Sequence, residues 1–175
     1  MMSGCVVVLL NTEREFMIKI GLDAQVRKTV VARLQLLLAN EYVVYTKTLK
    51  FHWNVYGKHF AAMHAFFKEQ YEAMLTITDD VAERVRALDA MSLGTLAEFL
   101  KHTTLKEEPG INPDDLGMVA ALLHDHEHII TQLRADIDET ARLGDMGTNN
   151  FLTELMEKHE KMAWMLRAFL QQSGE

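Results

Sequence analysis

Apolar residues recur along the chain at intervals of three and four positions, the spacing of amphipathic α-helices. A shorter helix over residues 93–102, with Ser92 as its N-cap, is expected in the connection between the second and third long helices. Together these elements predict an all-α four-helix bundle with a crossing connection. The four long helices are expected over residues 23–56, 60–88, 113–143 and 149–170.

Residues that favour helix ends lie at the predicted boundaries of the long helices. Gly57 and Gly144 suit left-handed C-terminal caps after the first and third long helices. Asn112 followed by Pro113 is typical of a helix start, because Asn caps well and Pro fits the first helical turn. Thr148 is the expected N-cap of the last helix.

Composition narrows the class of protein. The 175 residues suffice for one domain, and a net charge of −7 argues against a strongly basic nucleic-acid or phospholipid binder. The single Cys5 excludes an intrachain disulfide framework, and the apolar run 6–10 is too short to span a membrane. We therefore expect a cytoplasmic protein with a domain over residues 21–172, preceded by an N-terminal extension, residues 1–20, whose role the sequence leaves open.

Two histidines flank the turn between the first two long helices. His52 precedes Gly57 by five residues and His64 follows it by seven. At ~1.5 Å per residue, the two imidazoles are expected at similar heights on neighbouring antiparallel helices, where they can face each other.

Two carboxylates follow on the second helix. Asp79 and Glu83 are four residues apart, so they share one helical face and provide hard oxygen ligands suited to iron. They lie on the order of 22 and 28 Å beyond His64 along the same helix. If all four side chains share a metal, the carboxylates must come from a second copy of the chain across a two-fold interface.

The run Lys50-Phe-His-Trp-Asn-x-x-Gly57-x-x-Phe-x-x-x-His64, followed by Asp79-x-x-Ala-Glu-Arg84, closely resembles the signature of the Dps mini-ferritins. The similarity extends over about residues 21–170. It implies a ferritin-like dodecamer that oxidises Fe(II), usually with hydrogen peroxide, and stores the Fe(III) mineral inside. It also assigns iron binding to His52 and His64 of one subunit with Asp79 and Glu83 of its two-fold partner.

Other roles follow from the same resemblance. The resemblance implies that Trp53 is an electron donor, whereas without it ordinary interface packing of this side chain is favoured. Lys68 stands where the family commonly has an aspartate for a second iron, so we expect one firm iron position. Asp145 is a candidate for an acidic pore, and Glu69 and Glu72 are candidates for mineral nucleation.

Three alternatives remain beside this interpretation. Neither terminal segment is rich in lysine, so we expect no appreciable DNA binding or compaction at physiological salt. His124 and His128 could chelate zinc from one helical turn, although an exposed polar face that includes His126 is favoured. A conventional intra-subunit di-iron site needs Glu-x-x-His pairs, which the chain lacks, and His59, His102 and His159 are interpreted as structural.

Overall fold

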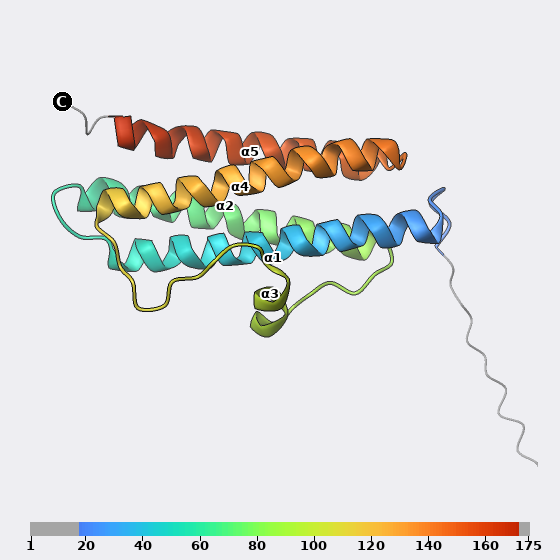
Figure 1. Cartoon of the computed structure of the whole chain (residues 1–175), viewed down its shortest axis with the longest axis horizontal. Helices are drawn as coiled ribbons and strands as arrows, with labels where there is room; N and C mark the ends of the chain where they lie inside the picture. Colours follow the sequence, from blue (N-terminus) through green and yellow to red (C-terminus); the bar gives the residue numbers. More distant parts are fainter. Residues whose placement is uncertain (1–17, 172–175) are drawn as a thin grey trace, which may run out of the picture.

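The computed structural model describes residues 18–171, and its described part consists of helices joined by turns and loops. Figure 1 shows four long helices lying side by side, with the short helix α3 outside the bundle next to α1. The predicted all-α four-helix bundle is therefore confirmed, as is the short helix in the connection between α2 and α4. In chain order the helices are α1 (Ala24–Asn54), α2 (Phe60–Ala87), α3 (Leu96–His102), α4 (Asp115–Arg142) and α5 (Met146–Gln171).

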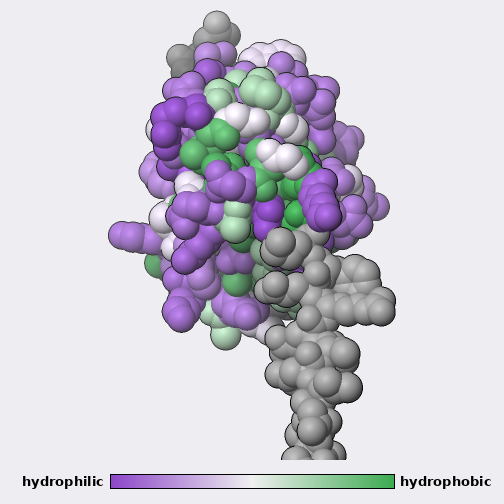
Figure 2. Space-filling view, turned by 90° about the vertical axis from the view of Figure 1, so that its right-hand side faces the viewer, coloured by the Kyte–Doolittle hydropathy of each residue, from purple (hydrophilic) through white to green (hydrophobic). Residues whose placement is uncertain are grey.

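The bundle is built from two antiparallel hairpins. α1 packs mainly on α2, and α4 packs mainly on α5. Each long helix turns an apolar face inward, as the fully buried Leu34, Phe67, Leu122 and Leu155 illustrate. Figure 2 views the end of the bundle at the start of α1, where polar side chains surround apolar ones. Among the helices of residues 18–171, none is long and apolar enough to cross a membrane.

Three of the predicted helix starts are wrong by two or three residues. α3 begins at Leu96 because Thr95, and not Ser92, forms a capping box with Glu98. α4 begins at Asp115, where the carboxylate of Asp114 accepts a hydrogen bond from the Gly117 amide at 2.8 Å. In each case a better-placed side chain nearer the helix replaces the predicted cap. Gly57 and Gly144 do adopt positive φ angles, of 99° and 76°.

The third wrong start concerns Asp145. α5 begins at Met146, because the Asp145 carboxylate accepts a hydrogen bond from the Thr148 amide at 3.0 Å. Asp145 is buried and forms an ion pair with Arg84 at 3.1 Å, and Arg84 also donates to the Thr148 hydroxyl. Asp145 thus fastens the end of α2 to the start of α5, and its predicted pore role stays a prediction.

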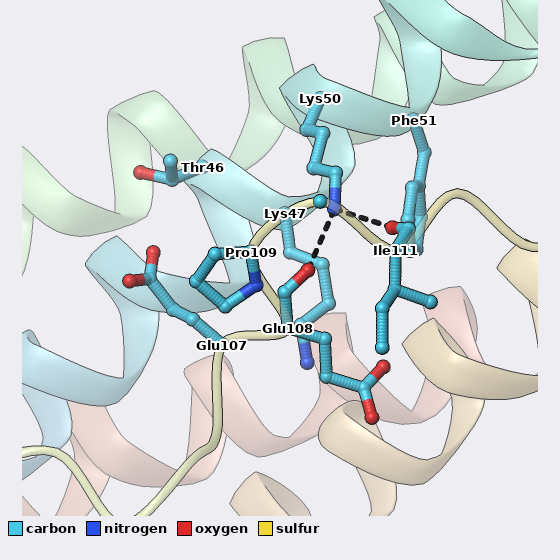
Figure 3. A pocket seen from close by; sticks show the side chains of 9 residues that line it. Thr46, Lys47, Lys50, Phe51, Glu107, Glu108, Pro109 and Ile111 are labelled. Carbon is cyan, nitrogen blue, oxygen red and sulfur yellow. Dashed lines mark hydrogen bonds between the residues drawn. The ribbon is translucent and has the colours of Figure 1, made fainter.

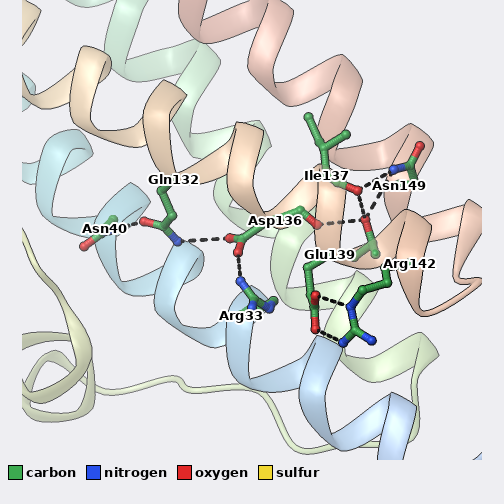
Figure 4. Close-up of polar contacts among 9 residues, drawn as sticks. Arg33, Asn40, Gln132, Asp136, Ile137, Glu139, Arg142 and Asn149 are labelled. Atoms are coloured by element: carbon green, nitrogen blue, oxygen red, sulfur yellow. Dashed lines mark hydrogen bonds and ion pairs between the residues drawn. The ribbon is translucent and has the colours of Figure 1, made fainter.

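Charged and amide side chains hold α1 against α4. Arg33 forms an ion pair with the buried Asp136, and Asn40 donates to Gln132 at 2.7 Å (Figure 4). Lys47 and Asp125 form a second ion pair further along the same helices, at 2.5 Å. These contacts fix the register between the two hairpins, because each side chain on α1 meets its partner on α4 only when the two helices are aligned in this way.

A charged cluster lies in the interior of the bundle, where the sequence did not indicate one. Glu41, His126 and His159, from α1, α4 and α5, are completely buried. His159 Nε2 lies 2.8 Å from Glu41 Oε1, and the Nδ1 atoms of His126 and His159 are 2.9 Å apart. The prediction of an exposed polar face for His126 is wrong. Burial, with the charge of His159, holds the pKa of His126 well below its usual value.

This buried histidine makes a testable contribution to stability. Because the pKa of His126 is lower in the folded chain than in the unfolded one, the unfolded chain binds more protons below about pH 6.5. The free energy of unfolding should therefore fall as the pH is lowered from about 7 to about 5, by up to ~1.4 kcal/mol per pH unit. In urea unfolding, His126→Gln should flatten this dependence and the exposed control His124→Gln should not. Equal slopes for all three proteins would contradict this account.

The fastening role of Asp145 is also testable. Asp145→Ala removes a helix cap and the partner of Arg84, and we expect a loss of about 2–4 kcal/mol in the free energy of unfolding. Denaturant unfolding measures the loss, with the exposed Asp138→Ala as the matched control. A variant of unchanged stability that takes up iron more slowly would instead support the pore role.

Candidate metal centre

The two predicted histidines lie side by side at the α1–α2 turn. His52 is buried in the last turn of α1, and His64 is half-buried in the second turn of α2. Their ring centroids are 3.8 Å apart and the planes differ by 23°, so the imidazoles are stacked, as the spacing predicts. Phe60 covers the other face of His64 at a centroid distance of 5.1 Å.

Reciprocal hydrogen bonds orient both rings. His52 Nδ1 lies 2.8 Å from the carbonyl oxygen of His64, and His64 Nδ1 lies 2.9 Å from the carbonyl oxygen of His52. A carbonyl oxygen only accepts, so each Nδ1 carries a proton and donates it. In the neutral ring the lone pair is then on Nε2, which is the arrangement found in metal-binding histidines. The hairpin thus presents two oriented nitrogen ligands.

The predicted carboxylates lie on α2, far from this pair. Asp79 and Glu83 are exposed and make no hydrogen bond or ion pair with the described part of the chain. They follow His64 by about 22 and 28 Å along a continuous helix. Within residues 18–171 no group of three or more His, Cys, Asp or Glu side chains lies together as a metal site. One chain therefore contains two separate sets of potential ligands.

Lys68 lies one turn beyond His64 on α2. Its amine is 3.6 Å from the carboxylate of Glu72, and both side chains are more than half exposed. Glu69 is exposed on the same helix and makes no hydrogen bond or ion pair with residues 18–171. Of the two predicted nucleation residues, Glu72 therefore has a lysine beside it, whereas Glu69 has no such partner in the described part of the chain.

The aromatic neighbours of His52 differ in exposure. Trp53 is 69% exposed and makes no ring contact among the described residues. Tyr71, which the sequence interpretation left without a role, contacts the edge of the His52 ring at a centroid distance of 5.3 Å. This contact could not be predicted from local spacing, because residues 52 and 71 are distant in sequence and meet only through the register of the α1–α2 hairpin.

The other histidines have separate partners. His128 Nε2 is 2.8 Å from the Thr104 hydroxyl, and His124 is exposed beside Asp125, so the two do not form a chelating pair. His59 pairs with Asp115 at 2.7 Å, which ties the α1–α2 turn to the start of α4 and holds the pKa of Asp115 below its usual value. The zinc alternative thus gains no support.

A cleft lies between α1 and the loop 107–111 (Figure 3). Its walls come from Lys47, Lys50 and Phe51 of α1 and from the loop 107–111. The Lys50 amine donates to the carbonyl oxygens of Glu108 and Ile111, at 3.1 and 2.6 Å. Both lysines already have partners, since Lys47 pairs with Asp125 and Lys50 holds the loop 107–111 against α1.

Comparisons with known proteins agree with this architecture. The protein-family model of the ferritin-like domain matches residues 31–173 of this chain. A low temperature-induced protein of Nostoc sp. is 43% identical over 155 residues, covering 88% of this chain and 87% of the relative. The DNA protection during starvation protein 2 of Bacillus anthracis is 33% identical over 145 residues, covering 83% and 99%.

Solved structures show the same relationship. The Dps protein of Vibrio cholerae O1, described as a member of a superfamily of ferritin-like diiron-carboxylate proteins, matches with a TM-score of 0.84 and 31% identity, covering 87% of this chain and 96% of that one. Dps from Thermosynechococcus elongatus matches with a TM-score of 0.80 and 32% identity, covering 83% and 92%. From these matches and its helical architecture, the chain belongs to the Dps family of ferritin-like proteins.

Proposed function

We propose that this protein oxidises Fe(II) at sites shared between two subunits and stores the Fe(III) product inside a closed shell. The observation that carries the proposal is the pair of oriented Nε2 atoms on His52 and His64, together with the unpartnered carboxylates of Asp79 and Glu83 on the same chain. Two copies related by a two-fold axis would bring each pair of nitrogens to a pair of carboxylates, giving two equal sites.

Exposed apolar side chains support such an assembly. Trp53, Tyr56 and Phe60 surround the α1–α2 turn, and Leu75 lies one turn before Asp79. Each of the four is 46–69% exposed, which is unfavourable for large apolar groups unless another surface covers them. Burial of both regions at one interface would place the nitrogen and carboxylate ligands together. The family resemblance favours twelve subunits in the complete shell.

The reaction follows from the ligands. Imidazole and carboxylate suit Fe(II), and the Nδ1 hydrogen bonds fix the rings so that little entropy is lost on binding. Hydrogen peroxide accepts two electrons, and each Fe(II) ion supplies one. The amine of Lys68, one turn from His64, would repel a second cation, so we propose one firm iron position per site. Glu69 is the better candidate for receiving the product, because Glu72 has Lys68 as a partner.

DNA compaction is the alternative function, since several relatives carry DNA protection in their names. Residues 1–17 and 172–175, which hold Cys5, the apolar run 6–10 and most of the terminal segments, lie outside the described residues. Their composition is not basic, and the net charge of the chain is −7. We therefore propose protection through iron and peroxide chemistry in the cytoplasm, without appreciable DNA binding.

Sharing of ligands between chains can be tested by complementation. We expect assemblies of His52→Ala/His64→Ala chains alone, or of Asp79→Ala/Glu83→Ala chains alone, to oxidise Fe(II) slowly. When the two variants are unfolded, mixed equally and reassembled, about one quarter of the sites regain all four ligands from different chains. The rate of Fe(III) formation after peroxide addition should then recover to about a quarter of the wild-type value.

The control is an equal mixture of the two variants assembled separately, which cannot exchange ligands. It should remain as slow as each variant alone. Failure of the reassembled mixture to recover, although gel filtration shows the wild-type size, would refute the shared site.

A further inference from the structure

Three tyrosines form a row of ring contacts that starts at the candidate metal centre. The ring of Tyr71 contacts His52, with centroids 5.3 Å apart. Tyr45 contacts Tyr71 at 6.3 Å, and Tyr42 contacts Tyr45 at 5.8 Å. Each contact is edge-on, with interplanar angles of 61–75°. These rings are in close packing contact, so an electron can pass along the row in short steps.

The row follows from the register of the α1–α2 hairpin. Tyr45 lies two turns before His52, and Tyr71 lies two turns after His64, so the two tyrosines face each other one level deeper in the hairpin. Tyr42 is the next residue on that side of α1 and stacks on the buried Phe99 of α3 at 4.3 Å. The row therefore leads from the end of the bundle that holds the α1–α2 turn towards α3, which lies outside the bundle.

Reduction of hydrogen peroxide to water and hydroxide requires two electrons, and the row of tyrosines can supply one of them. A single Fe(II) supplies one electron, and the repulsion by Lys68 leaves the site with one firmly held iron. We propose that Tyr71, backed by Tyr45 and Tyr42, supplies the second electron, an inference that rests on the proposed function. The balanced step is Fe(II) + TyrOH + H₂O₂ → Fe(III) + TyrO• + H₂O + OH⁻. The O–O bond breaks to give water and hydroxide, and no hydroxyl radical is released.

The surroundings of the tyrosines suit this step. All three rings are half-buried, and their hydroxyl groups make no hydrogen bond to residues 18–171. The phenolic proton therefore passes through solvent to one of the two hydroxides formed from peroxide, which gives the water of the balanced step. Movement of the oxidised state from Tyr71 to Tyr45 and Tyr42 separates it from the iron and from the next peroxide. Trp53 is less suited to this role, because it is mostly exposed and has no ring contact that leads inward.

The test uses the assembled protein loaded anaerobically with one Fe(II) per chain and mixed once with hydrogen peroxide. Fe(III) absorbance reports the ferroxidase reaction, freeze-quenched electron paramagnetic resonance reports the radical, and a spin trap reports hydroxyl radical. Ring-deuterated tyrosine identifies the radical, because deuteration narrows a tyrosyl signal and leaves a tryptophanyl signal unchanged. We expect about one Fe(III) per peroxide and a tyrosyl radical in the wild type.

Four variants make the test specific. Tyr71→Phe should lower the radical signal several-fold and raise the trapped hydroxyl radical, while Fe(III) still forms. Tyr45→Phe should keep the radical but shorten its lifetime, because it can no longer migrate. Trp164→Phe, whose exposed ring on α5 lies outside the row, is the control and should behave as the wild type. Lys68→Asp, loaded with two Fe(II) per chain, should bind the second Fe(II) and lower the radical yield.

The outcomes separate the two proposals. Oxidation of two Fe(II) per peroxide without a radical, or an undiminished radical in Tyr71→Phe, would overturn the tyrosine row and leave the ferroxidase function standing. A radical that deuterated tyrosine does not alter would assign the electron to Trp53 and also overturn it. Absence of Fe(III) formation in the wild type would overturn the ferroxidase function and the tyrosine row together.

Discussion

Two hydrogen bonds across the α1–α2 turn determine how this chain can bind a metal. Each bond joins Nδ1 of one histidine to the backbone carbonyl of the other, at 2.8 and 2.9 Å. They fix both the tautomer and the direction of the rings, and they also join the last turn of α1 to the first turns of α2. Stability of the hairpin and orientation of the ligands therefore have a common physical origin.

The sequence was sufficient to predict those features that depend on local spacing. The helices and the approach of His52 to His64 follow from periodicity and from the turn at Gly57. Features that depend on contacts between distant segments were missed. Glu41 and His159 gave no local signal, because their pairing arises only when α1 and α5 pack. The ion pair of Asp145 with Arg84 was missed for the same reason, since the two residues are distant in sequence.

The helix caps also differ between the prediction and the structure. Ser92, Asn112 and Thr148 are all favourable cap residues, yet Thr95, Asp114 and Asp145 form the caps. Several good caps close together in sequence compete, and the packing of the helix decides between them. The central claim is that Asp79 and Glu83 of a second chain complete the metal centre formed by His52 and His64.

An anaerobic crystal structure of the Fe(II)-loaded protein, with anomalous diffraction recorded at the iron edge, tests that claim most directly. The account predicts an anomalous peak in contact with Nε2 of His52 and His64 and with the carboxylates of Asp79 and Glu83 from a two-fold-related subunit. An iron peak held within one subunit would contradict it. So would a two-fold interface that leaves the two histidines and the two carboxylates apart.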